Sequence, residues 1–311
     1  MSAPSYGRIG VLMGGTSAER DISLQSGGAV LAALQSAGVD AVGIDLPNDL
    51  HNDWAASIQQ ADIHTAFIAL HGRLGEDGCV QGLLESMAIP YTGSGVTASA
   101  LCMHKVLCKQ VLNHAGLKTT VDISINADGP IRYPVFIKPV AEGSSIGLHY
   151  LTDETDWLAL QLHETTDWMA ELPAKGVEIA VSVLAGKALM PVEVKPHSGI
   201  YDYAAKYTAG ATDYFCPARL PAETLRHCMQ RAEQAVLATG CTGAPRVDMI
   251  VPSGGEPLIL EINTIPGMTE TSLLPKAAAA SGIDFTALCL RMIDSAGLEH
   301  DSNEKMGGDA R

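Results

Sequence analysis

Short apolar runs alternate with helical patterns through the first hundred residues. The runs IGVLM (residues 9–13), VDAVGIDL (39–46) and TAFIAL (65–70) are typical of buried strands, and apolar residues at helical spacing lie between the first two. Strands that alternate with helices predict a parallel α/β sheet, which binds ligands at the carboxyl ends of its strands. His71, which begins the segment HGRLGEDG, lies at such an end.

A glycine- and serine-rich turn, YTGSGVTAS, leads into an apolar helical pattern and indicates a domain boundary near residue 97. At 311 residues the chain exceeds the about 250 to 300 residues at which a single core stops growing. We therefore expect several domains and a polar, disordered tail. The expected parts are an N-terminal α/β domain (1–96), a central domain (97–175), a C-terminal domain (176–299) and the tail (300–311).

Two apolar runs near the C-terminus carry polar side chains on one face only. In RVDMIV, which begins at residue 246, Arg246 and Asp248 share a face, and in LILEIN, which begins at residue 258, Glu261 and Asn263 do. The intervening segment PSGGEP has turn composition and predicts a hairpin that pairs Asp248 with Glu261 and Arg246 with Asn263. The opposite face of the second run should be apolar, with the following residues together: Leu258, Leu260 and Ile262.

This hairpin would bring two carboxylates together. Cross-strand neighbours lie about 5 Å apart, so Asp248 and Glu261 should repel and destabilise the sheet unless a positive charge lies between them. A hard divalent cation is one solution, because Asp, Glu and Asn offer the oxygen ligands of Mg2+ or Mn2+, and Mg2+ usually arrives with phosphate. The alternative is that Arg246 neutralises both acids in a solvated cluster of ion pairs.

A second segment has the composition of a phosphate-binding site, although the sequence has no standard nucleotide-binding motif. The sequence has neither GxxxxGK[ST] nor GxGxxG. The strand YPVFIKP instead carries Lys138 near its end and runs into the loop VAEGSSIG, which is rich in backbone N–H and hydroxyl donors. Such a lysine and loop can fold over a polyphosphate, although the loop alone is more typical of a hairpin turn.

Composition limits the partners. The formal net charge of -15 argues against nucleic acid or an anionic membrane surface, because no basic surplus exists to neutralise phosphates. No apolar run approaches about 18 residues, and no signal-peptide pattern begins the chain, so we expect a cytoplasmic protein. The seven cysteines show no CxxC pair or zinc spacing and are expected to be reduced, mostly buried fillers.

Seven segments, in order, resemble the D-alanine:D-alanine ligase family, ATP-grasp enzymes of peptidoglycan synthesis. They are GGTSAERDISL, ALHGRLGEDG, YTGSGVTASALCMHK, IKPVAEGSSIG, YDYAAKY, RVDM and EINTIPGMTETSL, and the likeness runs from about residue 7 to residue 296. The resemblance implies an ATP-grasp fold of the mixed α/β class. Its parts would be a Rossmann-like N-terminal domain with a parallel sheet, a central lid domain over ATP and a C-terminal catalytic domain.

The resemblance also implies an activity. Family members activate the carboxylate of one D-alanine with ATP, and the amine of a second D-alanine attacks the resulting acyl phosphate. The expected partners are therefore ATP and two D-alanine molecules, and the expected assembly is a homodimer. The alternatives are an ATP-grasp ligase with another second substrate, such as D-lactate, and a silent nucleotide-binding regulator.

For ATP, the resemblance implies three ligands of Mg2+ or Mn2+, with two ions that bridge the acids and the phosphates: Asp248, Glu261 and Asn263. It implies three lysines on the phosphates, the first two on the α and β phosphates and the last near the γ phosphate: Lys105, Lys138 and Lys206. Glu171 and Glu178 match contacts to adenine and ribose. The segment ELPAK departs here from the family's usual Glu-Lys-aromatic pattern.

For the first D-alanine, the resemblance implies that Glu19 grips the ammonium and that His71 lies beside the substrate. Ser144 and Tyr207 match a pair that hydrogen-bonds with Glu19 and closes loops over the site, which excludes water. Taken alone, Glu19 is an ordinary acid of a first helical turn. The segment YDYAAKY has Ala204 where the family often has Glu.

For the second step, the resemblance implies that Arg246 and the backbone N–H of Gly267 stabilise the oxyanion of the tetrahedral intermediate. Glycine at 267 fits this role because it permits close backbone approach. Ser272 and the backbone of Leu273 would hold the carboxylate of the second D-alanine.

Overall fold

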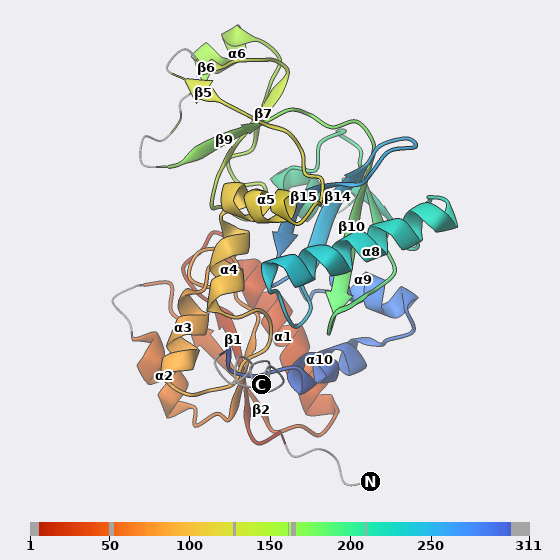
Figure 1. Ribbon diagram of the computed structural model, residues 1–311. Helices are drawn as coiled ribbons and strands as arrows, with labels where there is room; N and C mark the ends of the chain where they lie inside the picture. Colours follow the sequence, from red (N-terminus) through yellow and green to blue (C-terminus); the bar gives the residue numbers. More distant parts are fainter. Residues whose placement is uncertain are drawn as a thin grey trace, which may run out of the picture.

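The computed structural model describes residues 6–49, 53–126, 129–160, 162, 166–208 and 210–299. Within these residues, three sheets of more than two strands are stacked along the long direction of the molecule (Figure 1). The N-terminal sheet lies at the bottom of the view, a large sheet lies in the middle and a small sheet lies at the top. The tail predicted to be disordered, 300–311, lies outside the described residues.

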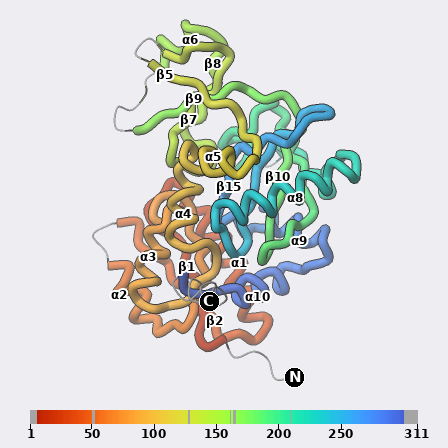
Figure 2. Tube along the Cα trace, in the orientation of Figure 1, coloured from red at the N-terminus to blue at the C-terminus, as the bar shows by residue number. Residues whose placement is uncertain are grey.

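The N-terminal sheet is parallel, as the sequence predicted, with strand order β2-β1-β3. Strands β1 and β3 are almost entirely buried because helices cover both faces of the sheet, whereas the edge strand β2 is half buried. The strands are β1 (Ile9–Gly14), β2 (Ala41–Leu46) and β3 (Thr65–Ile68), and the helices are α1 (Arg20–Ser36), α2 (Trp54–Gln60) and α3 (Cys79–Ser86). Helix α1 also packs against the C-terminal helix α10 (Phe285–Asp294), which lies beside it in Figures 1 and 2.

The small sheet has strand order β4-β9-β7-β8 and is antiparallel. One face buries a small apolar core around Val135 and Ile137, which helix α6 covers with Trp157. Lys138 alternates with these residues and therefore faces the other side. The strands are β4 (Asp122–Ile123), β7 (Val135–Pro139), β8 (His149–Leu151) and β9 (Trp168–Glu171); α6 is Glu154–Ala159, and a separate hairpin pairs β5 (Ile125–Asn126) with β6 (Gly129–Pro130).

The large sheet runs β13-β12-β10-β14-β15 and is antiparallel, with β11 paired to β10. Helices α4, α5 and α8 cover one face, while α9 packs on the other. The strands are β10 (Val177–Leu184), β11 (Lys187–Ala188), β12 (Val192–Pro196), β13 (Thr212–Phe215), β14 (Arg246–Val251) and β15 (Leu258–Asn263). The helices are α4 (Val96–Met103), α5 (Lys105–His114), α7 (Tyr203–Tyr207), α8 (Ala222–Thr239) and α9 (Leu273–Ala280).

The predicted hairpin register is confirmed at the polar end of β14 and β15, where Asp248 pairs with Glu261 and Arg246 pairs with Asn263. The predicted apolar face of β15 is wrong beyond that point. The register shifts between Asp248 and Met249, so Met249 pairs with Ile259, and Ile259 enters the core at 1% exposure. The extra residue of this bulge is Leu260, because a bulge reverses which residues of a strand face the core.

Two expectations from composition bear on the whole chain. All seven cysteines are free thiols; Cys79 is exposed, Cys216 is partly buried and the others are buried, which agrees with the prediction. Within the described residues, no single helix is long and apolar enough to cross a membrane, although the bent pair α9 and α10 meets the length and composition criterion together.

Candidate active site

A cavity of about 400 Å³ opens where the N-terminal sheet, the loop after β7 and the large sheet meet. It brings together twelve of the residues predicted for the site. They are Glu19, His71, Lys105, Ser144, Lys206, Tyr207, Arg246, Glu261, Asn263, Gly267, Ser272 and Leu273. The other predicted residues, Lys138, Glu171, Glu178 and Asp248, do not line this cavity.

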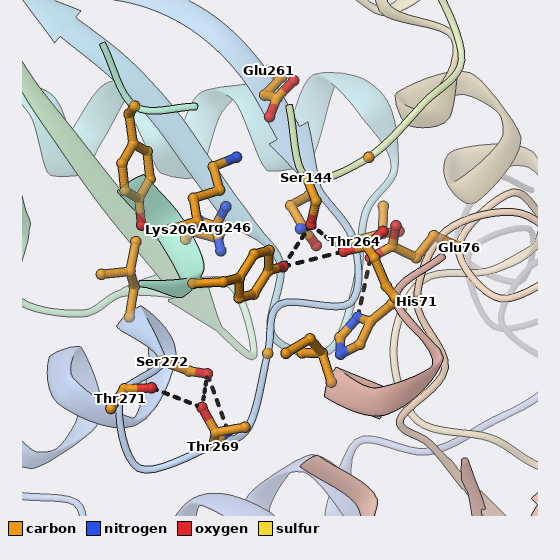
Figure 3. Close-up of a pocket in the computed structure, with 18 of the residues that line it drawn as sticks. His71, Glu76, Ser144, Lys206, Arg246, Glu261, Thr264, Thr269, Thr271 and Ser272 are labelled. Carbon is orange, nitrogen blue, oxygen red and sulfur yellow. Dashed lines mark hydrogen bonds and ion pairs between the residues drawn. The ribbon is translucent and has the colours of Figure 1, made fainter. Parts of the chain in front are cut away.

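Two loops and helix α7 are joined by one carboxylate. Ser144 donates a hydrogen bond to Oε1 of Glu19, its hydroxyl lies 2.6 Å from that of Tyr207, and the Tyr207 hydroxyl donates to the same Glu19 oxygen over 3.4 Å (Figure 3). Glu19 is 6% exposed and precedes α1 without capping it. Its side chain therefore faces the cavity and not its own helix. Burial and the nearby Glu76 raise the pKa of the Glu19 carboxyl.

The backbone of the loop after β7 passes close to Glu19. A Cβ on Gly143 would lie 2.8 Å from Oε2 of Glu19, so a larger residue there would require the Glu19 carboxylate to shift. Ser144 and Ser145 adopt left-handed backbone angles, with φ of 50° and 57°. Non-glycine residues rarely adopt that conformation, and it tends to occur at functional sites.

A buried imidazole–carboxylate pair borders the network. His71 Nδ1 lies 3.4 Å from Oε1 of Glu76 (Figure 3). The Gly72 N–H donates to Oε2 of Glu76 over 3.0 Å. Burial disfavours the charged ring, but the hydrogen bond and charge of Glu76 outweigh it and raise the pKa of His71. Sequence reasoning missed Glu76, although a carboxylate five residues after His71 in the same glycine-rich segment was an available signal.

The two acids of the hairpin each have a cation of their own. Arg246 donates to both oxygens of Asp248, over 2.7 and 2.8 Å, whereas Glu261 Oε2 lies 3.8 Å from Lys105 Nζ. The positive charge that the sequence analysis required beside the two acids is therefore present, supplied by two cations. The alternative in which Arg246 neutralises both acids holds only for Asp248, because the ion pair of Glu261 is with Lys105. Burial disfavours ionised Glu261, but Lys105, Lys206 and other cations outweigh it and lower its pKa to about 2.

The lysines predicted to bind phosphate differ in their surroundings. Lys105 donates to the carbonyl of Glu142 over 2.5 Å, and burial together with the charges of Lys138 and Lys206 lowers its pKa. Lys138 Nζ lies 2.5 Å from Oε2 of Glu171. Lys105 therefore touches the loop after β7, while Lys138 lies within the small sheet.

The two acids predicted to contact adenine and ribose have pKa values shifted in opposite directions. Glu171 is buried, but Lys138 and Lys109 outweigh the burial and lower its pKa. Burial and the charge of Asp248 raise the pKa of Glu178 to about 7. Sequence reasoning missed Lys109, because a lysine in an amphipathic helix pattern is normally read as solvated surface.

The segment before α9 forms a turn around a hydroxyl. Ser272 Oγ accepts the N–H of Thr269 over 3.1 Å and lies 2.7 Å from the Thr269 hydroxyl (Figure 3). A Cβ on Gly267 would lie 2.8 Å from Ser272 Oγ, so a larger residue there would require this hydroxyl to shift. Ser272 precedes the first turn of α9, where backbone N–H groups lack helical partners and suit an anion.

Comparisons with known proteins agree with this geometry. The family profile "D-ala D-ala ligase C-terminus" matches residues 105–294, and "D-ala D-ala ligase N-terminus" matches residues 47–94. The D-alanine--D-alanine ligase of Anaeromyxobacter sp. (strain K) is 46% identical over 313 residues, which cover 96% of this chain and 100% of the relative.

Solved structures extend the similarity to the fold. The D-alanine--D-alanine ligase of Bacillus anthracis superposes with a TM-score of 0.81 at 34% identity, over 97% of this chain and all of that one. The structure of that ligase complexed with ATP gives a TM-score of 0.79 at 32% identity, with the same coverage. The predicted ATP-grasp fold is confirmed, and the chain belongs to the D-alanine:D-alanine ligase family of ATP-dependent ligases.

Proposed function

We propose that this protein joins two D-alanine molecules into D-alanyl-D-alanine, with ATP as the source of the activating phosphoryl group. The observation that carries the proposal is the single cavity in which the Glu19–Ser144–Tyr207 network faces Arg246 and Ser272. An ammonium ligand, a closing contact, a buried cation and a carboxylate-binding helix terminus are the four parts that joining two amino acids requires.

The first D-alanine would bind between Glu19 and His71. The Glu19 carboxylate would accept its ammonium, and the Glu76 contact would keep the His71 ring oriented toward the substrate. Ser144 and Tyr207 would hold the loop after β7 and helix α7 against Glu19. This closure would keep water away from the acyl phosphate, which water would otherwise hydrolyse.

The phosphates of ATP would lie between the large and small sheets, against Lys105, Lys138 and Lys206. Glu261 and Asn263 fit a hard divalent ion, because a carboxylate held ionised and an amide oxygen are ligands typical of Mg2+ or Mn2+. Asp248 would join them at the same end of the hairpin. Two such ions, when bound, would neutralise phosphate charge and orient the γ phosphate toward the substrate carboxylate.

The expected metal ligands lie on two neighbouring strands, Asp248 on β14 and Glu261 and Asn263 on β15. Asp248 accepts two hydrogen bonds from Arg246, and Asn263 Oδ1 accepts one from the Ile265 N–H over 2.9 Å. Each of these oxygens keeps a lone pair for another contact. Among the described residues, no group of three or more His, Cys, Asp or Glu side chains is placed to hold an ion by itself. The site is therefore expected to be completed by the phosphates.

The second D-alanine would be held by its carboxylate, at Ser272 and the backbone N–H of Leu273. Its amine would attack the carbonyl carbon of the acyl phosphate, and phosphate would leave with the bonding pair. Arg246 and the N–H of Gly267 would stabilise the oxyanion that forms on the carbonyl oxygen. Glu178 and Glu171 would lie at the ribose and adenine end of the nucleotide.

We also propose a domain organisation, an assembly state and a location for the protein. We assign residues 1–96, 97–175 and 176–299 to the N-terminal, lid and catalytic parts, with the small sheet as the lid over ATP. A homodimer in the cytoplasm is the expected state, and light scattering and cell fractionation test it.

One assay tests the activity. Phosphate release from Mg-ATP should depend on D-alanine and Mg2+ together, and D-alanyl-D-alanine should form in equal amount. A mixture with equimolar D-lactate at pH 7.5 should still yield mainly the dipeptide. ATP hydrolysis that is equally fast without D-alanine would exclude the ligase, and a mainly D-alanyl-D-lactate product would exclude only the second substrate.

A further inference from the structure

A lysine that the proposed function does not use is buried beside the nucleotide lysines. Lys109 lies one turn after Lys105 on α5 and is only 2% exposed. Residues four apart lie on the same face of a helix, so α5 directs both side chains toward the junction of the large and small sheets. A buried lysine is costly unless it is paired, so its partners show what it does.

Lys109 makes three polar contacts, all with the small sheet or the segment before it. Its Nζ donates to the carbonyl of Thr120 over 3.1 Å and to the carboxylates of Asp122 and Glu171. Asp122 begins β4 and Glu171 ends β9, and these two residues are paired across the strands. Lys109 therefore fastens the edge of the small sheet to a helix that packs on the large sheet.

The key partner is Glu171, because it also holds Lys138. Oε1 of Glu171 accepts from Lys109 and from the Thr120 hydroxyl, the latter over 2.8 Å, and Oε2 lies 2.5 Å from Lys138 Nζ. A carboxylate offers about four acceptor positions. Three of the four are thus occupied, and a nucleotide can take only one.

The charges within this cluster explain why two lysines are needed. Asp122 and Glu171 carry two negative charges, and Lys109 and Lys138 carry two positive charges. Without Lys109, the two acids would face Lys138 alone, the cluster would be net negative, and the charge of Lys138 would be neutralised by the two acids. Both effects oppose an incoming phosphate, because like charges repel in a partly buried site.

We propose that Lys109 is a positioning residue for ATP, which acts through Glu171 to hold Lys138 in place and leave its charge available to the phosphates. Lys109 itself does not touch the nucleotide. This inference rests on the proposed function and deepens it. Glu171 becomes the link between a structural lysine and a phosphate-binding lysine, and its contact to adenine is limited to the one remaining acceptor position.

Calorimetry with a Mg2+ complex of adenylyl imidodiphosphate, in the absence of D-alanine, tests this directly. Lys109→Met should weaken nucleotide binding about tenfold, since a hydrogen-bonded charge contact in a buried site is worth that order of free energy. Lys109→Arg keeps the cation and should restore binding to within about threefold of wild type. In steady-state assays, Lys109→Met should raise the KM for ATP and leave the KM for D-alanine within about twofold.

Two further variants separate positioning from simple structural support. Asp122→Asn removes the other acid that Lys109 contacts, so nucleotide binding should stay within about twofold of wild type. Thr120→Val leaves every charge in place and removes only the hydroxyl bonded to Glu171. It should weaken binding about two- to threefold, and it tests the inference even if Lys109→Met does not fold.

The outcomes are distinct. A wild-type protein that binds no Mg-nucleotide would overturn the ATP site itself. A wild type that binds, with Lys109→Met or Thr120→Val binding equally well, would overturn only the role of Lys109. A Lys109→Met protein that loses affinity for D-alanine as much as for nucleotide, together with a lower melting temperature that Arg does not rescue, would make Lys109 purely structural.

Discussion

The hairpin of β14 and β15 and the network around Glu19 hold their functional groups in opposite ways. In the hairpin, strand pairing places Arg246 opposite Asn263 and Asp248 opposite Glu261. In the network, Ser144 and Glu19 are separated by 125 residues, and Tyr207 and Glu19 by 188, so contacts between side chains, and not strand pairing, join them.

The loss of a side chain should therefore have a different effect in each region. A group on a paired strand is already in place before substrate binds, so losing it removes chemistry and leaves the geometry of its neighbours intact. A group on a loop contributes to the position of the loop itself, so losing it alters closure over the site. Substitutions in the two regions should therefore affect different steps.

The largest effect is expected at the hairpin. Arg246→Ala should lower kcat about thousandfold, because removing one donor to a developing oxyanion has that magnitude. Phosphate release and dipeptide formation should fall together in steady-state assays. Arg219→Ala is a matched control, since Arg219 also binds a carboxylate in two-pronged fashion, that of Glu193, away from the cavity. A kcat for Arg246→Ala within about tenfold of wild type would contradict the oxyanion role.

The second effect, also in the hairpin, concerns the metal. Glu261→Gln should lower activity about a hundredfold at limiting Mg2+ and recover part of it at high Mg2+, because one anionic ligand is lost. Titration of activity with Mg2+ measures this. Recovery that is absent at every Mg2+ concentration would argue against Glu261 as a metal ligand.

The same variant reports on electrostatics without metal. The pKa of Glu261 is lowered to about 2 from its ordinary 4.5, so its ionised form stabilises the fold above pH 4.5, and that contribution is lost as the pH falls through 2. Glu261→Gln should therefore melt a few degrees lower than wild type at pH 7 in metal-free buffer. An unchanged or higher melting temperature would show that repulsion from Asp248 dominates after all.

The network should give a smaller effect of another kind. Tyr207→Phe removes the hydroxyl that meets Ser144 and Glu19, so closure should loosen, kcat should fall about tenfold, and some acyl phosphate should be hydrolysed. More phosphate would then be released than dipeptide formed. Tyr203→Phe is the control, because its ring packs 4.7 Å from that of Tyr207 on the same helix and it lines no part of the cavity. Equal phosphate and dipeptide yields in Tyr207→Phe would exclude a closing role.

The contrast also explains what the sequence alone could predict. Alternation and turn composition determine a hairpin locally, so its register at Asp248 and Glu261 was predictable. The bulge at Leu260 was not, because residues 258–260 are all apolar and the pattern does not show which of them is the extra residue. The Glu19 network was predictable only from the resemblance, since no local pattern relates residues so far apart.

Charges were the hardest part to predict. For Asp248 and Glu261, the sequence analysis considered Arg246 or a metal ion as the neutralising charge, but Glu261 pairs with Lys105, from a helix more than 150 residues earlier in the chain. The ion pairs of Lys109 could not be predicted for the same reason, because its partners lie on β4 and β9. A side chain's charge is evident from the sequence, whereas its counter-charge depends on the tertiary fold.

The smallest predicted effect tests whether the acidic side chains held close together on this sheet lower the stability of the fold. Burial and Asp248 raise the pKa of Glu178 from 4.5 to about 7. The neutral carboxyl therefore favours the fold below pH 4.5, and this contribution is lost as the pH rises through 7. Glu178→Gln stays neutral at every pH. It should melt at about the wild-type temperature at pH 5 and about 2 °C higher at pH 8 in metal-free buffer.

A surface carboxylate is the control for this last measurement. Glu223, in the first turn of α8, is exposed, and Glu223→Gln removes the same charge away from the hairpin. Its melting temperature relative to wild type should be the same at pH 5 and pH 8. If Glu178→Gln behaves like Glu223→Gln, the acids on this face are neutralised by the surrounding lysines and Arg246. If the melting temperature of Glu178→Gln relative to wild type rises with pH as expected, ionised Glu178 destabilises the protein in the absence of nucleotide.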